Sequence, residues 1–425
     1  MIEISNKLFE MCDNIEKKLE KQFKEIDKVC ERNTLKVLNA FSNNSLAYSD
    51  FAEVNGYAFF DTSRDKLEKI FAEVLGAEDS LVRPQIMSGT NAIYITLSAL
   101  LRCGDCLLCI SGLPYDPLQE IVGVRGNSSQ SLVSYGVVYK QIDLVQNDFD
   151  YAKIEEYILK FKPKVVEIQR SCGYEDRKGL SISQIKNVCS FIKNLDKNII
   201  IMCDNCYGEL VEELEPTQVG VDVMSGSLMH NLGGGIATSG GYIAGKNEII
   251  EQVADRLTSP GLGRYLGADY NQKIKYFKGL FMAPRTVANA VKSALLISAL
   301  AEEFKFDGVC PKSTDKRSDI IQTFNLPNER ALIEFCNSLQ CSSPVDSFYY
   351  AEPFNMPSYS HQEVMSAGTF TQGSTIELTC DAPICSPYKV FVQGGLTYES
   401  SKLAILSAFT KMLKYTLSDA KVKTS

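Results

Sequence analysis

Short apolar runs alternate with helical stretches between residues 80 and 250, and this alternation limits the chain to a few architectures. Strand-like runs occur at 80–83, 106–110, 136–139, 164–168, 198–202 and 240–245, and helices are predicted at 91–101, 154–160 and 182–195. Strand–helix alternation of this kind predicts an α/β domain with a mostly parallel sheet. Because glycines flank the last run, it is the candidate for an antiparallel strand.

Different patterns flank this region on both sides. Residues 1–48 repeat apolar side chains at three- and four-residue spacing, as Leu8, Ile15 and Leu19 illustrate, which predicts an amphipathic arm suited to packing on a partner subunit. A loop at 51–61 and a helix at 63–75 follow. An apolar helix at 287–304 leads into a C-terminal α+β domain. Since 425 residues exceed one usual core, we predict an arm and interface segment (1–75), a large α/β domain (76–300) and a small domain (301–425).

Composition excludes several classes of function. A net charge of −8 with no basic stripe argues against nucleic-acid binding. The first residues carry acids and no apolar segment, which argues against a signal peptide, and no apolar run reaches membrane-spanning length. We therefore expect a cytoplasmic protein with no membrane partner. The 14 cysteines include two CxxC pairs, but we interpret them as free thiols and expect no metal site.

Two features are compatible with a site for a phosphorylated cofactor. Ser88, Gly89 and Thr90 precede a predicted helix, and a helix N-terminus with hydroxyl groups suits a phosphate, although such a cap is also common without a ligand. Asp204 follows a buried strand, where ligand groups gather in open α/β sheets. A turn or N-cap aspartate is the alternative.

A glycine-rich segment at 222–245 carries the third feature. Ser225 and Ser227 precede His230 and are candidates for phosphate binding, while the glycines that follow let backbone approach a ligand closely. An ordinary glycine-rich turn is the alternative. Tyr115 is a fourth feature, a candidate ring to stack on a planar cofactor or simply a packed aromatic.

Longer strings carry a resemblance to a known family. They are FAEVLGAED (71–79), VRPQ (82–85), DNCYGE (204–209), EPT (215–217), PVDS (344–347), AGTF (367–370), QGS (372–374) and QGGLTYE (393–399). From about residue 50 to 415 the chain resembles the methionine γ-lyase-related family, also labelled aluminium resistance proteins. This family lies within the fold-type I enzymes that use pyridoxal phosphate (PLP).

The resemblance implies a PLP-binding large domain, a small C-terminal domain and a homodimer or homotetramer. It implies that Ser88, Gly89, Thr90 and Ser227 contact the phosphate, that Tyr115 stacks on the ring and that Asp204 pairs with the ring nitrogen. It also implies that Tyr57 and Arg64 reach across the interface toward the phosphate of a neighbouring subunit.

The chain departs from the family where chemistry is expected. His230 stands where the family has its Schiff-base lysine, and an imidazole has no primary amine to form that bond. Cys385 stands where the family often has an arginine, which would clamp a substrate carboxylate. Asn91, Cys172 and Leu113 replace a histidine, an arginine and a lysine of the family pattern. Loss of polar site groups from a retained scaffold is what relaxed catalytic demand predicts.

Three functions remain open on the sequence. The first is a carbon–sulfur lyase on sulfur amino acids, impaired because PLP enters without its lysine. The second is a non-catalytic paralogue that acts as a scaffold or regulatory subunit, in a hetero-oligomer with an active relative. The third is altered chemistry in which His230 and Cys385 pair to form a thiolate nucleophile.

Overall fold

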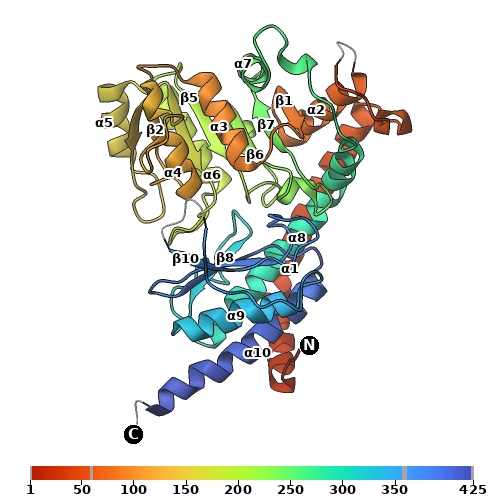
Figure 1. The fold of residues 1–425 in the computed structure, drawn as a ribbon, viewed down its shortest axis with the longest axis vertical. Coiled ribbons are helices and arrows are strands. Elements are labelled where there is room, and N and C mark those ends of the chain that lie inside the picture. The colour runs from red at the N-terminus through yellow and green to blue at the C-terminus, as the bar shows by residue number, and fades with distance from the viewer. Residues whose placement is uncertain (1, 58–60, 357–360, 423–425) are drawn as a thin grey trace.

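A computed structural model describes residues 2–57, 61–356 and 361–422 of the chain. Figure 1 shows a larger unit that contains a seven-stranded sheet and a smaller unit that contains a five-stranded sheet. Helices α1 (Asn6–Asn43) and α8 (Lys273–Glu303) pack against each other and run along both units. Part of the predicted loop, residues 58–60, lies outside the described residues.

The large sheet confirms the predicted fold class. Its strands are β1 (Asp79–Arg83), β2 (Cys106–Cys109), β3 (Val138–Gln141), β4 (Val165–Gln169), β5 (Ile200–Asp204), β6 (Val223–Ser227) and β7 (Gly241–Gly245). They lie in the order β1-β7-β6-β5-β4-β2-β3. Only β7, among these strands, runs antiparallel to its neighbours, as the flanking glycines of the last apolar run suggested.

Strand β6 was not among the predicted strands. Its Ser-Gly-Ser end lacks the β-branched residues that favour a strand. The segment is nevertheless extended because it is buried and pairs with β5 on one edge and β7 on the other. Tertiary pairing therefore overrides the local preference.

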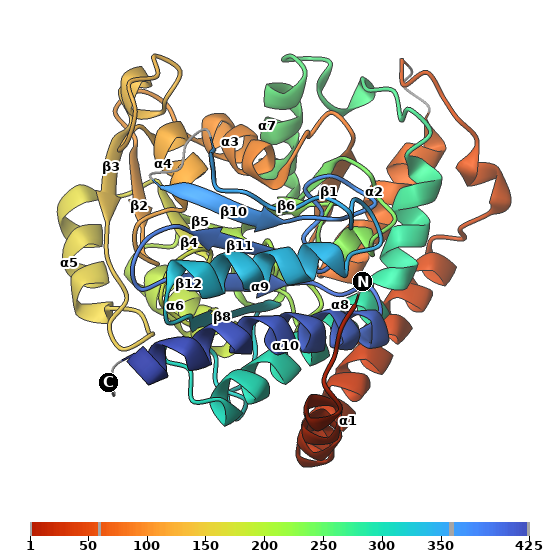
Figure 2. The ribbon, with the colours of Figure 1, turned by 60° about the horizontal axis from the view of Figure 1, so that its bottom comes forward.

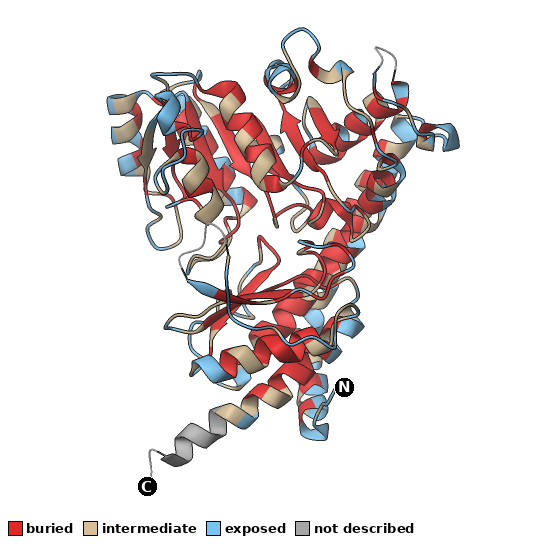
Figure 3. Ribbon diagram, in the orientation of Figure 1, coloured by how far each residue is buried: buried red, intermediate tan, exposed pale blue. Residues whose placement is uncertain are grey.

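Helices cover both faces of the large sheet and complete a three-layer unit. On one face lie α2 (Thr62–Leu75), α5 (Tyr151–Phe161), α6 (Ile182–Leu195) and α8, and on the other lie α3 (Gly89–Leu100), α4 (Asp116–Val122) and α7 (Asn247–Leu257). Successive strand residues such as Leu107 and Leu108 enter opposite cores. Each fully buried side chain of this size stabilises the fold by roughly 1.5–3 kcal/mol. Figure 3 shows this buried interior in the strands.

The small sheet is antiparallel throughout. Its strands are β8 (Ile321–Asn325), β9 (Phe354–Asn355), β10 (Gln362–Ser366), β11 (Thr379–Pro383) and β12 (Lys389–Gln393), in the order β8-β12-β11-β10-β9. Helices α9 (Glu329–Cys341) and α10 (Tyr398–Val422) pack on each other and lie against this sheet (Figure 2). Short 3-10 helices occur at η1 (Tyr48–Phe51), η2 (Val133–Tyr135), η3 (Pro216–Val219), η4 (Asn231–Gly233) and η5 (Gly263–Tyr265).

The apolar face of the N-terminal arm packs within its own chain. Leu8, Cys12, Ile15 and Leu19 of α1 belong to the core that the small sheet shares with α8, α9 and α10. The arm was expected to suit a partner subunit, but this face is already covered. The predicted helix at 287–304 is the second half of α8, which continues through Pro284. In the described part of the chain, no helix is both long and apolar enough to cross a bilayer.

Candidate functional site

A cavity of about 260 Å³ lies between the two units, at the carboxyl ends of β4, β5 and β6. Ligand sites are common at this edge of an open α/β sheet. The large unit contributes Ser88, Gly89, Thr90, Tyr115, Pro117, Gln169, Ser171, Gly173, Tyr174, Asp204, Cys206, Tyr207, Ser227, Met229 and His230 to its lining. The small unit contributes Ile321, Gly373, Asp381, Phe391 and Gln393.

The start of α3 forms one wall of the cavity. Ser88 caps the helix, and its hydroxyl accepts a hydrogen bond from the Asn91 N–H at 3.1 Å. The hydroxyl of Tyr115 donates to Oγ1 of Thr90 at 2.7 Å. Backbone N–H groups at a helix start are unpaired within the helix, so this wall suits a phosphate.

Gly89 allows α3 to begin close to the sheet. A Cβ atom at this position would lie 2.8 Å from Sγ of Cys206 and 3.4 Å from Cβ of Ser227. The first distance is shorter than real Cβ contacts. Because Gly89 has no side chain, the start of α3 can lie close enough to the end of β6 for both to line the same cavity.

Asp204 supplies a buried carboxylate at the end of β5. Its Oδ1 accepts a hydrogen bond from the N–H of Cys206 at 3.1 Å. Burial raises the pKa of Asp204 to about 6, which leaves the group mostly ionised at pH 7. Behind it, burial and then repulsion by Asp204 raise the pKa of Glu167 to about 8. Asp204 is therefore the charged member of this pair and can hold a ring N–H.

His230 lies on the same cavity, just after β6. Its Nδ1 is 2.7 Å from Oγ1 of Thr375, a residue of the small unit. Its ring stacks on Tyr207 with centroids 4.9 Å apart and planes 27° apart. Burial lowers the pKa of His230 to about 4, so the imidazole is neutral at pH 7.

The backbone of Tyr207 is strained where it supports this ring. Its φ of 70° lies in the left-handed region, which is unusual for a bulky side chain. Strain of this kind costs about 1–3 kcal/mol and concentrates at functional sites. The conformation places the aromatic ring beneath His230.

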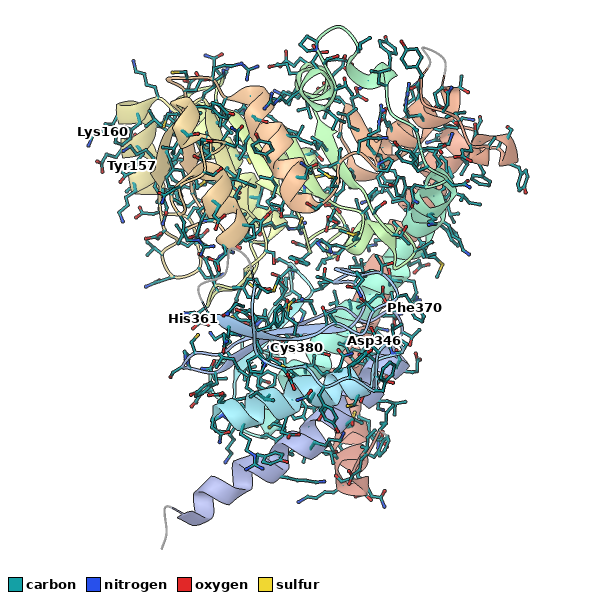
Figure 4. The ribbon with its side chains drawn as sticks, viewed as in Figure 1. Tyr157, Lys160, Asp346, His361, Phe370 and Cys380 are labelled. Atoms are coloured by element: carbon teal, nitrogen blue, oxygen red, sulfur yellow. The ribbon has the colours of Figure 1, made fainter. Side chains whose placement is uncertain are left out.

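Most of the predicted site residues meet in this cavity. Ser88, Gly89, Thr90, Tyr115, Asp204, Ser227 and His230 all line it. The chain's other histidine, His361, lies outside the cavity, just before β10 (Figure 4).

Four predicted residues lie elsewhere. Ser225 is buried under α3, where its hydroxyl is 3.0 Å from that of Thr96. Ser225 lies two residues before Ser227 on β6, so it sits inside the unit, behind the residues that line the cavity. Cys385 follows β11. Burial, and then repulsion by Glu363, raise the pKa of its thiol. The remaining two are Tyr57, an exposed residue that bridges to Leu266, and Arg64, a buried residue in the first turn of α2.

The sequence interpretation missed several lining residues. Gln169 at the end of β4 accepts the Tyr115 N–H at 3.1 Å and so fixes that aromatic. Asp381 and Gln393 line the cavity from β11 and β12, and Thr375, which contacts His230 without lining the cavity, comes from the loop before β11. Only Gln169 carried a usable signal, because it directly follows the predicted strand at 164–168, as Asp204 follows a buried strand. The other three depend on how the small unit docks.

The two sheets and the cavity at the strand ends define an α/β protein of the fold-type I class. The PLP-dependent protein YhfS of Escherichia coli shares this fold with a TM-score of 0.61 at 14% identity, and covers 91% of this chain and 97% of its own. Residues 8–413 match the methionine gamma-lyase family, so the chain belongs to that family.

Two relatives are similar over nearly the whole length. The chain is 44% identical over 393 residues to the uncharacterized protein YnbB of Bacillus subtilis, which spans 92% of this chain and 93% of that protein. It is 40% identical to a solved carbon-sulfur lyase involved in aluminum resistance from Clostridium novyi. That structure superposes with a TM-score of 0.92 and covers 96% of each chain.

Proposed function

We propose that this protein binds PLP in the cavity without a covalent bond and is an impaired carbon–sulfur lyase. The observation that supports this is the identity of residue 230. Among the residues that the structure describes, no lysine lines the cavity, and a neutral imidazole stands beside Thr375. A covalent PLP anchor requires a primary amine, which an imidazole lacks.

The remaining groups fit the cofactor. Ser88, Gly89, Thr90 and Ser227 would hold the phosphate at the start of α3, and Asp204 would hold the pyridine N–H. Tyr115 would pack on the ring, held by Gln169. When bound, PLP supplies an electron sink for bonds at the substrate α-carbon.

His230 can assist turnover only in part. A neutral imidazole can accept or release a proton, which supports acid–base work at the cavity. It cannot perform the amine exchange by which a lysine loads substrate and releases product. We therefore expect slow turnover of sulfur amino acids such as methionine or cystathionine.

The same feature favours a second role as a non-catalytic subunit. The protein would then bind PLP and stop there, as a scaffold or regulator in a homodimer, a homotetramer or a hetero-oligomer with an active relative. Tyr57 and Arg64 would serve a neighbouring subunit's phosphate. A His230–Cys385 nucleophile has less support, because Cys385 does not line the cavity. A cytoplasmic location stays a prediction.

A titration with PLP tests the proposal. Saturable binding is expected, and Asp204→Asn should weaken it about tenfold because the ring N–H loses a charge-assisted bond. The control Asp176→Asn, at an exposed aspartate paired with Lys389, should bind as the unmodified protein does. Absence of PLP binding, or rapid release of thiol from methionine or cystathionine, would contradict the proposal.

A further inference from the structure

The charges on the cavity wall are all negative. The described lining contains two carboxylates, Asp204 and Asp381, and neither lysine nor arginine. Both carboxylates are more than nine-tenths buried, at 4% and 7% exposure. A buried charge needs a partner of opposite sign or several hydrogen bonds. The wall therefore selects among ligands by charge.

Asp381 is held in place by its neighbours. Its Oδ2 accepts a hydrogen bond from Nε2 of Gln393 at 2.8 Å, and the same amide donates to Oγ1 of Thr379 at 3.1 Å. Tyr174 also bonds to the carboxylate. A carboxylate has about four acceptor positions, so these contacts leave capacity for a donor from a ligand.

The nearby basic groups are committed elsewhere. Arg177 donates to the carbonyl oxygens of Gln169 and Ser171 and pairs with Glu175, and Lys389 pairs with Asp176 at 2.7 Å. Neither side chain lines the cavity. A ligand carboxylate would thus enter beside Asp381 with no cation among the described lining residues to meet it.

We propose that the cavity binds a primary amine that lacks an α-carboxylate more tightly than the matching amino acid, with Asp381 as the residue that sets this preference. Asp204 is occupied by the cofactor ring in the proposed function, on which this inference rests. Asp381, on the wall that the small unit contributes, is then the carboxylate left to meet the rest of the ligand. A ligand α-carboxylate beside Asp381 would be repelled by the negative charge of that side chain in a buried space. A ligand with a hydrogen atom in place of the carboxylate would not be repelled.

Two stable conjugates separate these ligand classes by one group. Phosphopyridoxyl-methionine and phosphopyridoxyl-3-(methylthio)propylamine are both reduced adducts with the same ring, phosphate and thioether, and only the first has a carboxylate. Calorimetric titration of the full-length protein gives their dissociation constants. The propylamine conjugate should bind at least about tenfold more tightly, which is roughly 1.4 kcal/mol.

Asp381→Asn keeps the shape of the wall and removes its charge, so it should shrink this preference to about twofold or less. Glu363→Gln is the matched control, on the neighbouring strand and outside the lining. Burial, and then repulsion by Asp381 and Asp116, raise the pKa of Glu363 to about 8, so its side chain is mostly neutral at pH 7 while Asp381 is present and the preference should persist. Circular dichroism checks that both variants fold.

Three results would overturn the inference. Equal or tighter binding of the methionine conjugate to the unmodified protein would mean that a cation from elsewhere, such as a second copy of the chain, meets the carboxylate. An unchanged preference in Asp381→Asn would remove its assigned role. In both cases PLP itself still binds, so the proposed function survives. Failure of PLP and of both conjugates to bind would overturn both.

Discussion

Residue 230 determines how a cofactor can be held in this cavity. The proposed phosphate and ring contacts would come from hydroxyls, backbone N–H groups and Asp204, none of which depends on a covalent bond. The imidazole of His230 makes a polar contact with Thr375 and stacks on the ring of Tyr207. At the residue scale, residue 230 is a packed, neutral imidazole, where the family resemblance implies an amine.

The burial of His230 predicts a loss of stability in acid. Its folded-state pKa of about 4 lies below the usual 6.5, so its contribution is complete above pH 6.5 and is lost as pH falls toward 4. His230→Gln, which has no such titration, should therefore lose about 1–2 kcal/mol less unfolding free energy than the unmodified protein over this range. Urea denaturation at pH 7 and pH 4.5 measures this difference, and parallel losses would contradict the assignment.

At the scale of elements, the contact between the start of α3 and the end of β6 builds the phosphate wall. Ser88 caps the helix, and Gly89 brings it against Cys206 and Ser227. The helix start was visible in the sequence as a Ser-Gly-Thr cap, and the segment around Ser227 only as part of a glycine-rich stretch. Their closeness was not, because β6 has too little strand preference to be recognised locally.

Gly89→Ala should disturb this wall. The new methyl group would overlap Sγ of Cys206 at 2.8 Å, and the resulting shift should weaken PLP binding about tenfold and destabilise the fold by about 1–3 kcal/mol. The double change Gly89→Ala with Cys206→Ala removes the clashing sulfur and should restore most of both losses. Titration and thermal unfolding of the unmodified protein and the two variants test this, and no rescue in the double variant would place the damage elsewhere.

At the scale of the whole molecule, the cavity exists because two units close on each other. The small unit supplies Asp381 and Gln393 to the lining, and the contact between its Thr375 and His230 spans 145 residues of sequence. Periodicity predicted the parallel sheet, the antiparallel last strand and the site residues at strand ends. It could not predict this wall, because docking of the small unit depends on long-range packing through α1 and α8.

Thr375→Val should loosen this closure. The variant keeps the volume of the side chain but removes the hydroxyl that meets Nδ1 of His230, a hydrogen bond worth about 1 kcal/mol. Denaturant unfolding should show a loss of about that size, while Thr314→Val, at an exposed threonine, should show none. Equal effects of the two changes would mean that the contact does not join the units.

The assembled state is a further expectation at this scale. A homodimer or homotetramer would bring Tyr57 and Arg64 toward a neighbouring cavity, which suits the exposed position of Tyr57. Light scattering of the purified protein should give a mass of two or four times 47.2 kDa. A monomer at micromolar concentration would remove these two residues from the site.

Borohydride reduction of the PLP-loaded protein, followed by peptide mass mapping, tests the central claim most directly. The claim is that PLP is held without a bond to the protein, so the peptide that contains His230 should carry no adduct and PLP should leave on denaturation. His230→Lys is the positive control and should gain a reduced PLP adduct at residue 230, because Asp204, Ser88 and Ser227 still seat the cofactor. A reduced PLP adduct at a defined lysine of the unmodified protein, or on the peptide of residue 230, would contradict the account.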